Sequence, residues 1–193
     1  MPRVASRQQA ETGEPANAEP ATTLRVRLSG GNPRSLGAVD AVITLCKAQP
    51  DRLDELISCV IDCPDEIVRM RASDALEKIC RAQPSLVQPR LSVILGAMSR
   101  IDQPSVQWHA AQMLAELRLN ARQRRRAVRI LDDNLKRSTD WIVLNCTLGA
   151  LAVLARQQPE LVEVLRVELH RFANHHLKSV SWRARKLLAE FGD

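Results

Sequence analysis

The sequence predicts an all-α protein built from stacked pairs of helices, and two observations carry this prediction. A pattern of spaced apolar residues starts at Val68 and returns at Val106, Val143 and Val180, in steps of 38, 37 and 37 residues. Repetition with a period of about 20–50 residues is typical of folds in which each unit packs on its neighbours. The composition agrees: hydrophobic residues make up 45% of the chain but aromatic residues only 3%, with no Tyr. An aliphatic core of this kind suits closely packed helices.

The first part of the chain differs from the rest. Residues 1–22 are rich in Ala, Pro, Glu, Gln, Thr and Arg and offer little to bury, which favours disorder. Residues 24–28 then alternate apolar and basic side chains, which favours a strand. A mobile tail segment is the other interpretation of these five residues. We therefore predict a disordered N-terminal tail over 1–33 and a single folded domain over 34–193.

Within this domain, each unit has a first helix, a short link and a second helix. The apolar residues of each first helix recur at i, i+4, i+7, i+8 and i+11, which places them on one face. Three links end in proline, at Pro50, Pro84 and Pro159, and proline stops a preceding helix. Predicted second helices span 51–61, 85–98, 124–136 and 160–173. Pro89 lies near the start of one of them, so a first-turn position and a local kink are both open. The predicted units are 35–63, 64–101, 102–138, 139–176 and a terminal half-unit, 177–193.

Residues 64–76 read Pro-Asp-Glu-Ile-Val-Arg-Met-Arg-Ala-Ser-Asp-Ala-Leu and resemble the first helix of a HEAT repeat. In that family an Asp near the helix start, a Val-Arg pair and spaced Ala-Ala-Leu residues recur. The resemblance extends over about 35–193. It implies an armadillo-type fold, a right-handed α-α superhelix of about four and a half HEAT-like repeats. It also implies the usual role of this family, a non-catalytic scaffold that binds a partner protein.

The charge of the chain predicts an anionic partner. The net charge is +6, and arginine supplies 23 of the 28 basic residues. Arginine suits planar, bidentate contacts with carboxylate or phosphate groups. We expect the partner to be a protein with an acidic surface. Nucleic acid, bound through its phosphates, is the alternative, and a simple solvated face would also explain the basic clusters.

The densest basic cluster falls on the predicted helix 124–136 and the residues just before it. Its arginines share one helix face, whereas Val128, Leu131 and Leu135 are predicted to point to the core. A second basic region lies near the C-terminus. The candidate partner-binding cations are Arg122, Arg125, Arg126 and Arg129 in the first region, with Arg183 and Lys186 in the second.

The three tryptophans are the remaining candidates for partner contacts. Trp108 and Trp182 occupy the same repeat position, two residues after the recurring valine. A large side chain there either packs between adjacent units or is an exposed anchor for a partner, because Trp is enriched in binding hot spots. Trp141 begins its predicted helix, where both interpretations are open. We include Trp108 and Trp141 among the candidate contacts.

No motif in the sequence points to catalysis or to a cofactor. The chain has no G-x-S-x-G, P-loop or dinucleotide fingerprint. The histidines at 170, 175 and 176 and the cysteines at 59 and 63 lack the four-ligand spacing of a structural zinc site. We expect neither enzymatic activity, nor a cofactor, nor a bound metal.

The cysteines and the hydropathy pattern predict a cytoplasmic protein. The five cysteines form no CxxC pair and lie mostly among apolar neighbours, as reduced thiols do. No apolar run is long enough for a signal peptide or approaches the ~20 residues that span a membrane. Cys146 shares a repeat position with Arg71, His109 and Arg183, which we expect to face away from the main apolar stripe.

Overall fold

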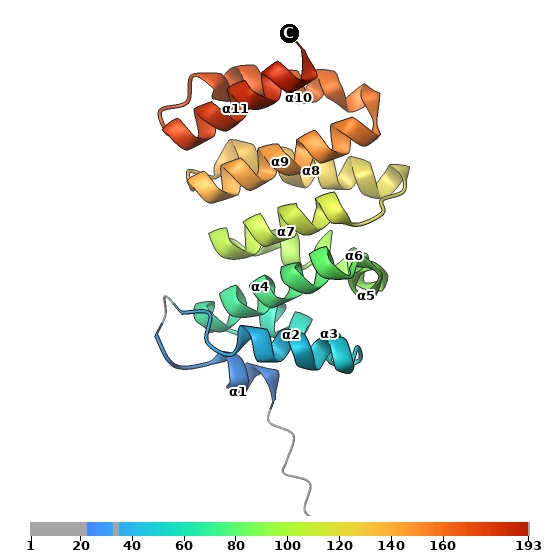
Figure 1. The fold of residues 1–193 in the computed structure, drawn as a ribbon, viewed down its shortest axis with the longest axis vertical. Coiled ribbons are helices and arrows are strands. Elements are labelled where there is room, and N and C mark those ends of the chain that lie inside the picture. The colour runs from blue at the N-terminus through green and yellow to red at the C-terminus, as the bar shows by residue number, and fades with distance from the viewer. Residues whose placement is uncertain (1–22, 33–34, 193) are drawn as a thin grey trace, which may run out of the picture.

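The computed structural model describes residues 23–32 and 35–192, which contain helices and no strand. The helices follow one another along the long axis of the molecule, from α1 at one end to α10 and α11 at the other (Figure 1). Their bounds are α1 Leu24–Leu28, α2 Val39–Ala48, α3 Arg52–Ile61, α4 Glu66–Ala82, α5 Pro84–Val87, η1 Gln88–Arg90, α6 Leu91–Ile94, η2 Met98–Arg100, α7 Pro104–Glu116, α8 Ala121–Arg137, α9 Trp141–Gln157, η3 Pro159–Leu161, α10 Val162–Ala173 and α11 Lys178–Phe191.

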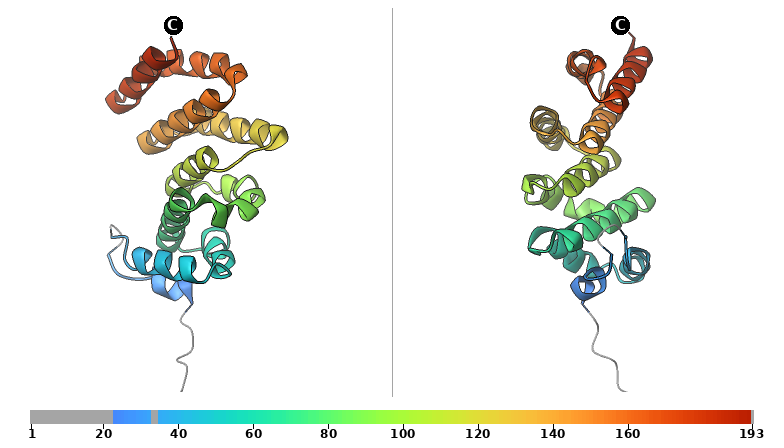
Figure 2. Two further views of the ribbon diagram at one scale, coloured as in Figure 1. Left: turned by 45° about the vertical axis from the view of Figure 1, so that its right-hand side comes forward. Right: turned by 90° about the vertical axis from the view of Figure 1, so that its left-hand side faces the viewer.

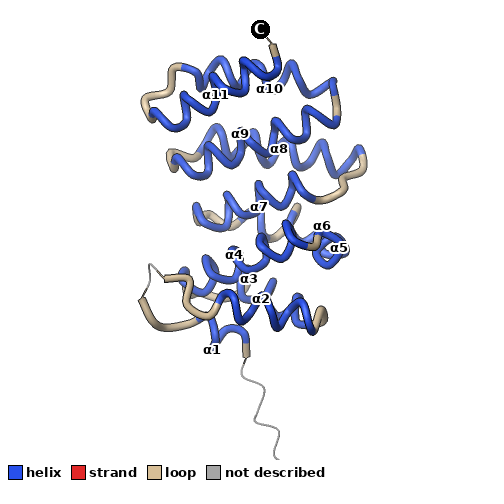
Figure 3. The backbone as a smooth tube through the Cα atoms, in the orientation of Figure 1, coloured by secondary structure: helices blue, strands red, loops and turns tan. Residues whose placement is uncertain are grey.

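The helices pack in successive layers. The first helices of the predicted units form a continuous row in which α2 packs on α4, α4 on α7, α7 on α9 and α9 on α11. The second helices pack beside them, α3 on α4, α8 on α7 and α9, and α10 on α9 and α11. Figures 2 and 3 show this layering along the chain. The all-α prediction is confirmed for the described residues.

The core lies between these layers and is aliphatic, as the composition predicts. The four recurring valines at 68, 106, 143 and 180 are all fully buried. The small residue four positions later is buried as well, at Ala72, Ala110, Thr147 and Ala184, where its size lets neighbouring helices approach closely. The apolar stripe that defines the repeat is therefore the surface along which the helices pack.

Polar residues set the starts of three long helices. The Asp65 carboxylate accepts hydrogen bonds from the backbone N–H groups of Ile67 and Val68 in the first turn of α4. The Asp140 carboxylate caps α9 in the same way, with Ile142 and Val143 as donors. Asn120 forms a capping box with Gln123 at the start of α8. These side chains satisfy N–H groups that have no partner inside the helix, which fixes where each helix begins.

The prediction for residues 24–28 is wrong, because these residues form the short helix α1. Leu24 and Leu28 are fully buried, whereas Val26 is 60% exposed. Spacing of i and i+4 places the two leucines on one helix face, and a strand would have put Val26 on the same face. Residues 23–32 thus belong to the fold instead of a tail that reaches residue 33. The predicted disorder of 1–22 lies outside the described residues.

The N-terminal segment is held in place by Arg71 of α4, a buried side chain that the sequence analysis placed on the outer side. Its guanidinium donates to the backbone carbonyls of Leu28 and Gly30 at 2.7 Å, Asn32 at 2.8 Å and Ser35 at 3.0 Å. The four acceptors make use of its rigid fork of donors. The N–H group of Leu24 adds a 2.6 Å hydrogen bond to Glu55 of α3.

The prediction of one continuous second helix over 85–98 is also wrong, because the structure has four short helices there, α5, η1, α6 and η2. Pro89 lies inside η1, where it has no N–H to continue an α-helical ladder. Gly96 lies in the turn after α6, and a Cβ at this position would lie 2.9 Å from the carbonyl oxygen of Ser92. The other predicted second helices, which correspond to α3, α8 and α10, are continuous or nearly so.

Candidate functional site

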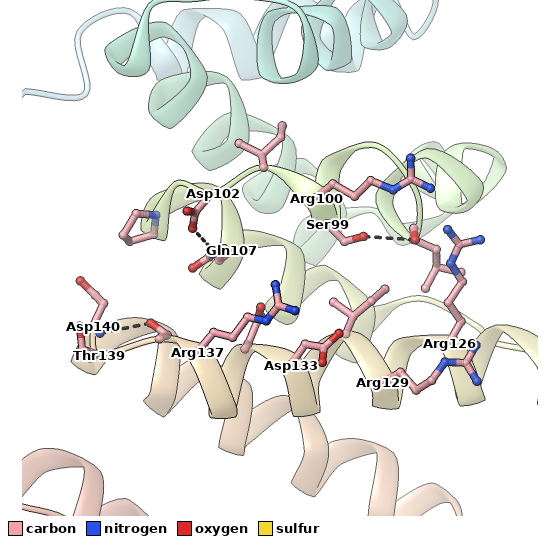
Figure 4. Close-up of a pocket in the computed structure, with 16 residues that line it drawn as sticks. Ser99, Arg100, Asp102, Gln107, Arg126, Arg129, Asp133, Arg137, Thr139 and Asp140 are labelled. Carbon is pink, nitrogen blue, oxygen red and sulfur yellow. Dashed lines mark hydrogen bonds between the residues drawn. The ribbon is translucent and has the colours of Figure 1, made fainter.

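An open groove of about 790 Å³ lies between α8 and the segment that runs from the end of α6 to the start of α7 (Figure 4). The broken second helix forms one wall, and α8 forms the other. The lining residues are Leu95, Ser99, Arg100, Ile101, Asp102, Pro104, Gln107, Arg126, Arg129, Ile130, Asp133, Asn134, Arg137, Ser138, Thr139 and Asp140. We call this site the α8 groove.

The broken helix shapes the groove wall through its backbone. The Ser99 hydroxyl donates to the carbonyl oxygens of Leu95 and Gly96, at 3.2 and 3.1 Å, and so occupies two acceptors that the broken helix leaves free. Gly96 has no side chain, and the Arg126 guanidinium lies against it, with Nη2 3.8 Å from the position of an added Cβ. Arg126 of α8 thus comes within ordinary contact distance of the opposite wall of the groove at Gly96.

Four arginines line the groove, and the charge is unevenly distributed along it. Arg100 comes from η2, and Arg126, Arg129 and Arg137 come from α8. Figure 4 shows Arg100, Arg126 and Arg129 toward one end of the groove and Asp102, Thr139 and Asp140 toward the other, with Arg137 and Asp133 between them. The groove therefore has a cationic end and a polar, acidic end.

Within the described part of the chain, none of these four guanidiniums lies within 4.0 Å of a carboxylate oxygen. Elsewhere arginines are paired, as in Arg90 with Asp54 and Arg156 with Glu190, each at 2.6 Å. Two of the three groove carboxylates have partners of their own, whereas Asp133 lies one helical turn from Arg129 and Arg137 on α8. Asp140 caps α9, and Asp102 accepts a 3.3 Å hydrogen bond from Gln107. The cationic end is thus available to an external anion.

The structure distributes the predicted contact residues over several places. Arg126 and Arg129 line the α8 groove, whereas Arg122 and Arg125 are exposed on the same helix outside it. The predicted core residues of α8 are buried at Leu131 and Leu135 and partly buried at Val128. The predicted basic face of α8 is therefore real, but only part of it borders a concave site.

The other candidates lie away from the groove or at its margin. Trp108 is half-buried, with its ring edge-to-face against His109 at a centroid distance of 5.3 Å. Trp141 is 53% exposed and follows Asp140 at the polar end of the groove. Lys186 lies over the ring of Trp182 on α11, with its ammonium 5.2 Å from the ring centroid. The candidate partner-binding residues therefore do not form one continuous surface.

Arg183 lies beside a second hollow, of about 360 Å³, on the row of first helices α4, α7, α9 and α11. Cys146 lines it too. Burial raises the pKa of the Cys146 thiol to about 11, although nearby Arg183 acts in the opposite direction. The thiol is therefore protonated at neutral pH and a poor nucleophile. Glu77, whose pKa burial also raises, lines the same hollow.

The sequence analysis also missed a polar contact between α4 and α7. Ser73 Oγ lies 2.9 Å from His109 Nδ1, and His109 Nε2 lies 3.6 Å from an Asp74 oxygen. These residue types occur in hydrolytic triads, but Ser73 is fully buried and its hydroxyl donates to the Met70 carbonyl at 2.9 Å. The contact therefore links α4 and α7 in the interior of the molecule, with its serine shielded from solvent.

The pKa values of two acidic residues next to this contact, Asp74 and Glu77, are shifted in opposite directions. Burial acts to raise the pKa of Asp74, but contacts with His109 and Lys78 outweigh it, and the pKa lies below its ordinary value. Burial raises the pKa of Glu77, and Arg81, 3.6 Å away, only partly compensates. Neither group lines the α8 groove.

No known protein family, curated protein or solved structure matches this chain. Among residues 23–32 and 35–192, no group of three or more His, Cys, Asp or Glu side chains is placed to hold a metal ion. Within the same residues, no helix combines the length and the apolar character needed to cross a membrane.

Proposed function

We propose that this chain is a short HEAT-like α-solenoid that acts as a non-catalytic scaffold and binds an acidic segment of a partner protein in the α8 groove. The observation that carries the proposal is the set of four groove arginines that form no ion pair with any carboxylate that the structure describes. The layered helix pairs and the recurring valine pattern support the HEAT-like architecture, in which one surface commonly serves as a binding face.

Arginine at the cationic end suits an acidic peptide. A guanidinium presents parallel N–H donors that match the two oxygens of a carboxylate, and such charge-assisted hydrogen bonds are stronger than neutral ones. A single exposed ion pair is worth only about 0.2–1 kcal/mol. Several cations in a concave site, with apolar Leu95, Ile101 and Ile130 beside them, bind an anion better together than separately. Asp102 and Asp133 would repel a uniformly acidic ligand, which favours a segment with a defined acidic end.

The test compares two double charge reversals on α8. Arg126→Glu with Arg129→Glu changes the groove, and Arg122→Glu with Arg125→Glu makes the same charge change on the same helix outside it. The wild type and both variants are used as bait in native lysate, with and without nuclease, and the recovered partner is then titrated by fluorescence anisotropy.

We expect a stoichiometric partner that survives nuclease and binds the groove variant at least about tenfold more weakly than wild type. The outer variant should retain most of the affinity. Equal loss in both variants would show that only the overall charge matters, and unchanged binding in the groove variant would refute the groove as the site.

Nucleic acid is the second candidate, and the exposed row of arginines on α8 favours it. Phosphate contacts predict binding to any sequence, with log affinity falling linearly with log salt concentration. The carboxylates of the groove interrupt the positive surface, which argues against a continuous phosphate track. Nuclease-sensitive capture with a steep salt dependence, reduced in both α8 variants, would establish this function instead.

A further inference from the structure

Among the described residues, Trp182 is the more exposed of two exposed tryptophans, at 62% of its surface against 53% for Trp141. It lies on α11, with the Lys186 ammonium above its ring. A tryptophan ring buries much apolar surface when a partner covers it. A ring as exposed as that of Trp182 can therefore contribute strongly to the binding of a partner. The α8 groove does not include this residue.

The repeat shows what covers this position elsewhere. Trp182 follows its recurring valine by two residues, as do Met70 in α4, Trp108 in α7 and Asn145 in α9. The next first helix packs on each of these three helices, and Met70 and Trp108 are half-buried while Asn145 is only 9% exposed. Among the described residues no further helix packs on that side of α11. Trp182 therefore lies where another helix would fit.

The residues around Trp182 indicate the charge of that helix. Lys178, Arg185 and Lys186 lie one turn away on either side, and all are exposed. Arg185 stands where α9 has the fully buried Leu148, and Ala189 stands where α9 has the buried Ala152. The only acidic residue of α11 is Glu190, which pairs with Arg156 at 2.6 Å. Within α11, the face thus combines an apolar centre with cations, and the one carboxylate of the helix is paired.

We infer that this face of α11 binds an acidic amphipathic helix of a partner protein. The helix packs on α11 as α11 packs on α9, with an apolar side chain over Trp182 and carboxylates toward Lys178, Arg185 and Lys186. A second copy of this chain fits poorly, because a symmetric contact would place these cations against each other. The inference uses a surface separate from the α8 groove and does not depend on the proposed function.

The experiment uses a fluorescein-labelled helical peptide with leucines at i, i+3, i+4 and i+7 and glutamates at its exposed positions. The same peptide with lysines in place of the glutamates is the charge control. Anisotropy titrations use the full chain carrying Arg126→Glu with Arg129→Glu, so that the α8 groove does not contribute. Within this background, Trp182→Ala tests the anchor, Lys186→Glu tests the charge, and Trp141→Ala is the matched control at another exposed tryptophan. Circular dichroism checks that each variant is folded.

We expect saturable binding of the acidic peptide and none of the basic peptide. Trp182→Ala and Lys186→Glu should each weaken binding at least about tenfold, as truncation of a hot-spot residue does, and Trp141→Ala should leave it unchanged. No saturation up to about 1 mM peptide, or equal effects of Trp182→Ala and Trp141→Ala, would overturn the inference. Self-association in sedimentation that Trp182→Ala abolishes would also overturn it, because the occupant would then be a second copy.

Discussion

Single side chains in this molecule connect segments that are far apart in the sequence, and Arg71 is the strongest example. It is 1% exposed, and all its acceptors are backbone carbonyls of residues 28–35. A buried cation normally needs a carboxylate partner, but several carbonyl dipoles can replace one. Gly37 contributes to this arrangement, because it has a φ of +57° and a Cβ there would lie 3.2 Å from Arg71 Cζ.

Arg71→Met tests this connection. We expect it to lower the free energy of unfolding by about 2–4 kcal/mol, because it removes charge-assisted hydrogen bonds and leaves carbonyls without donors. Urea denaturation measures the change. Hydrogen exchange of Leu28 should also accelerate, since α1 loses its attachment.

The control for this change is Arg118→Met, at an exposed arginine with no ion pair in the described residues. It should alter stability by no more than about 0.5 kcal/mol. If both variants unfold at the same urea concentration, the guanidinium does not hold the N-terminal segment.

At the scale of the element, the interruption of one helix distinguishes this chain from a regular stack. Pro89 and Gly96 divide the segment between α4 and α7 into short pieces, and α8 on the other side of the groove is continuous. A proline ends a helical ladder wherever it lies beyond the first turn. The groove is thus a consequence of one irregular element beside a regular one.

Two glycines allow a matched test of this element. Gly96→Ala should destabilise the protein by about 1–3 kcal/mol, because its Cβ would lie 2.9 Å from the Ser92 carbonyl oxygen and the backbone must shift. Gly149→Ala should instead stabilise it by about 0.5–1 kcal/mol, because this glycine lies inside α9 and its added Cβ would meet Arg183 only at 3.5 Å. Thermal unfolding of both variants measures the change in Tm, which should fall for Gly96→Ala and rise for Gly149→Ala. Stabilisation by Gly96→Ala would show that the turn after α6 is not tightly packed.

At the scale of the whole molecule, the layers differ in how completely they are covered. First helices α7 and α9 have a neighbouring first helix on both sides, whereas among the described residues α11 has one on the side of α9. In a stacked fold each layer is stabilised mainly by its neighbours. Local opening should therefore cost less at α11 than at the centre.

Native-state hydrogen exchange measures this difference. Amides in the middle of α7 and α9 should exchange at least about tenfold more slowly than those in the middle of α11, since sub-global opening frees the less covered layer first. Equal protection across all three helices would mean that the molecule opens only as a whole. Addition of the acidic peptide should slow exchange in α11 if it binds there.

Most helices and the core could be predicted from the sequence. The recurring valines, the spaced alanines and the proline-terminated links located α2, α4, α7, α9 and α11 and their buried faces. The segment at 24–28 could not be assigned, because five residues fit alternation as well as i, i+4 spacing. The two possibilities differ only in whether Val26 is buried with the leucines, and that depends on α3 and α4.

For the candidate site the sequence was less informative. It located the basic face of α8 but not the opposing Arg100, and it placed Arg183 and Lys186 in one basic region, although Arg183 lines the second hollow and Lys186 lies over Trp182. Pro89 allowed a kink to be considered, yet not a groove. The residue three positions after each recurring valine was expected to face outward. Arg71 and His109 occupy this position, and both are buried against neighbouring layers.

The sequence by itself determined the helical class, the repeat and the residues of the aliphatic core, because burial of a helix face follows from the spacing of apolar residues along the chain. Only the tertiary structure decided which cations share a groove, which arginines pair with a carboxylate of another helix, and which tryptophan is covered. These properties depend on distances between side chains from different layers, and the spacing of residues within one helix carries no information about them.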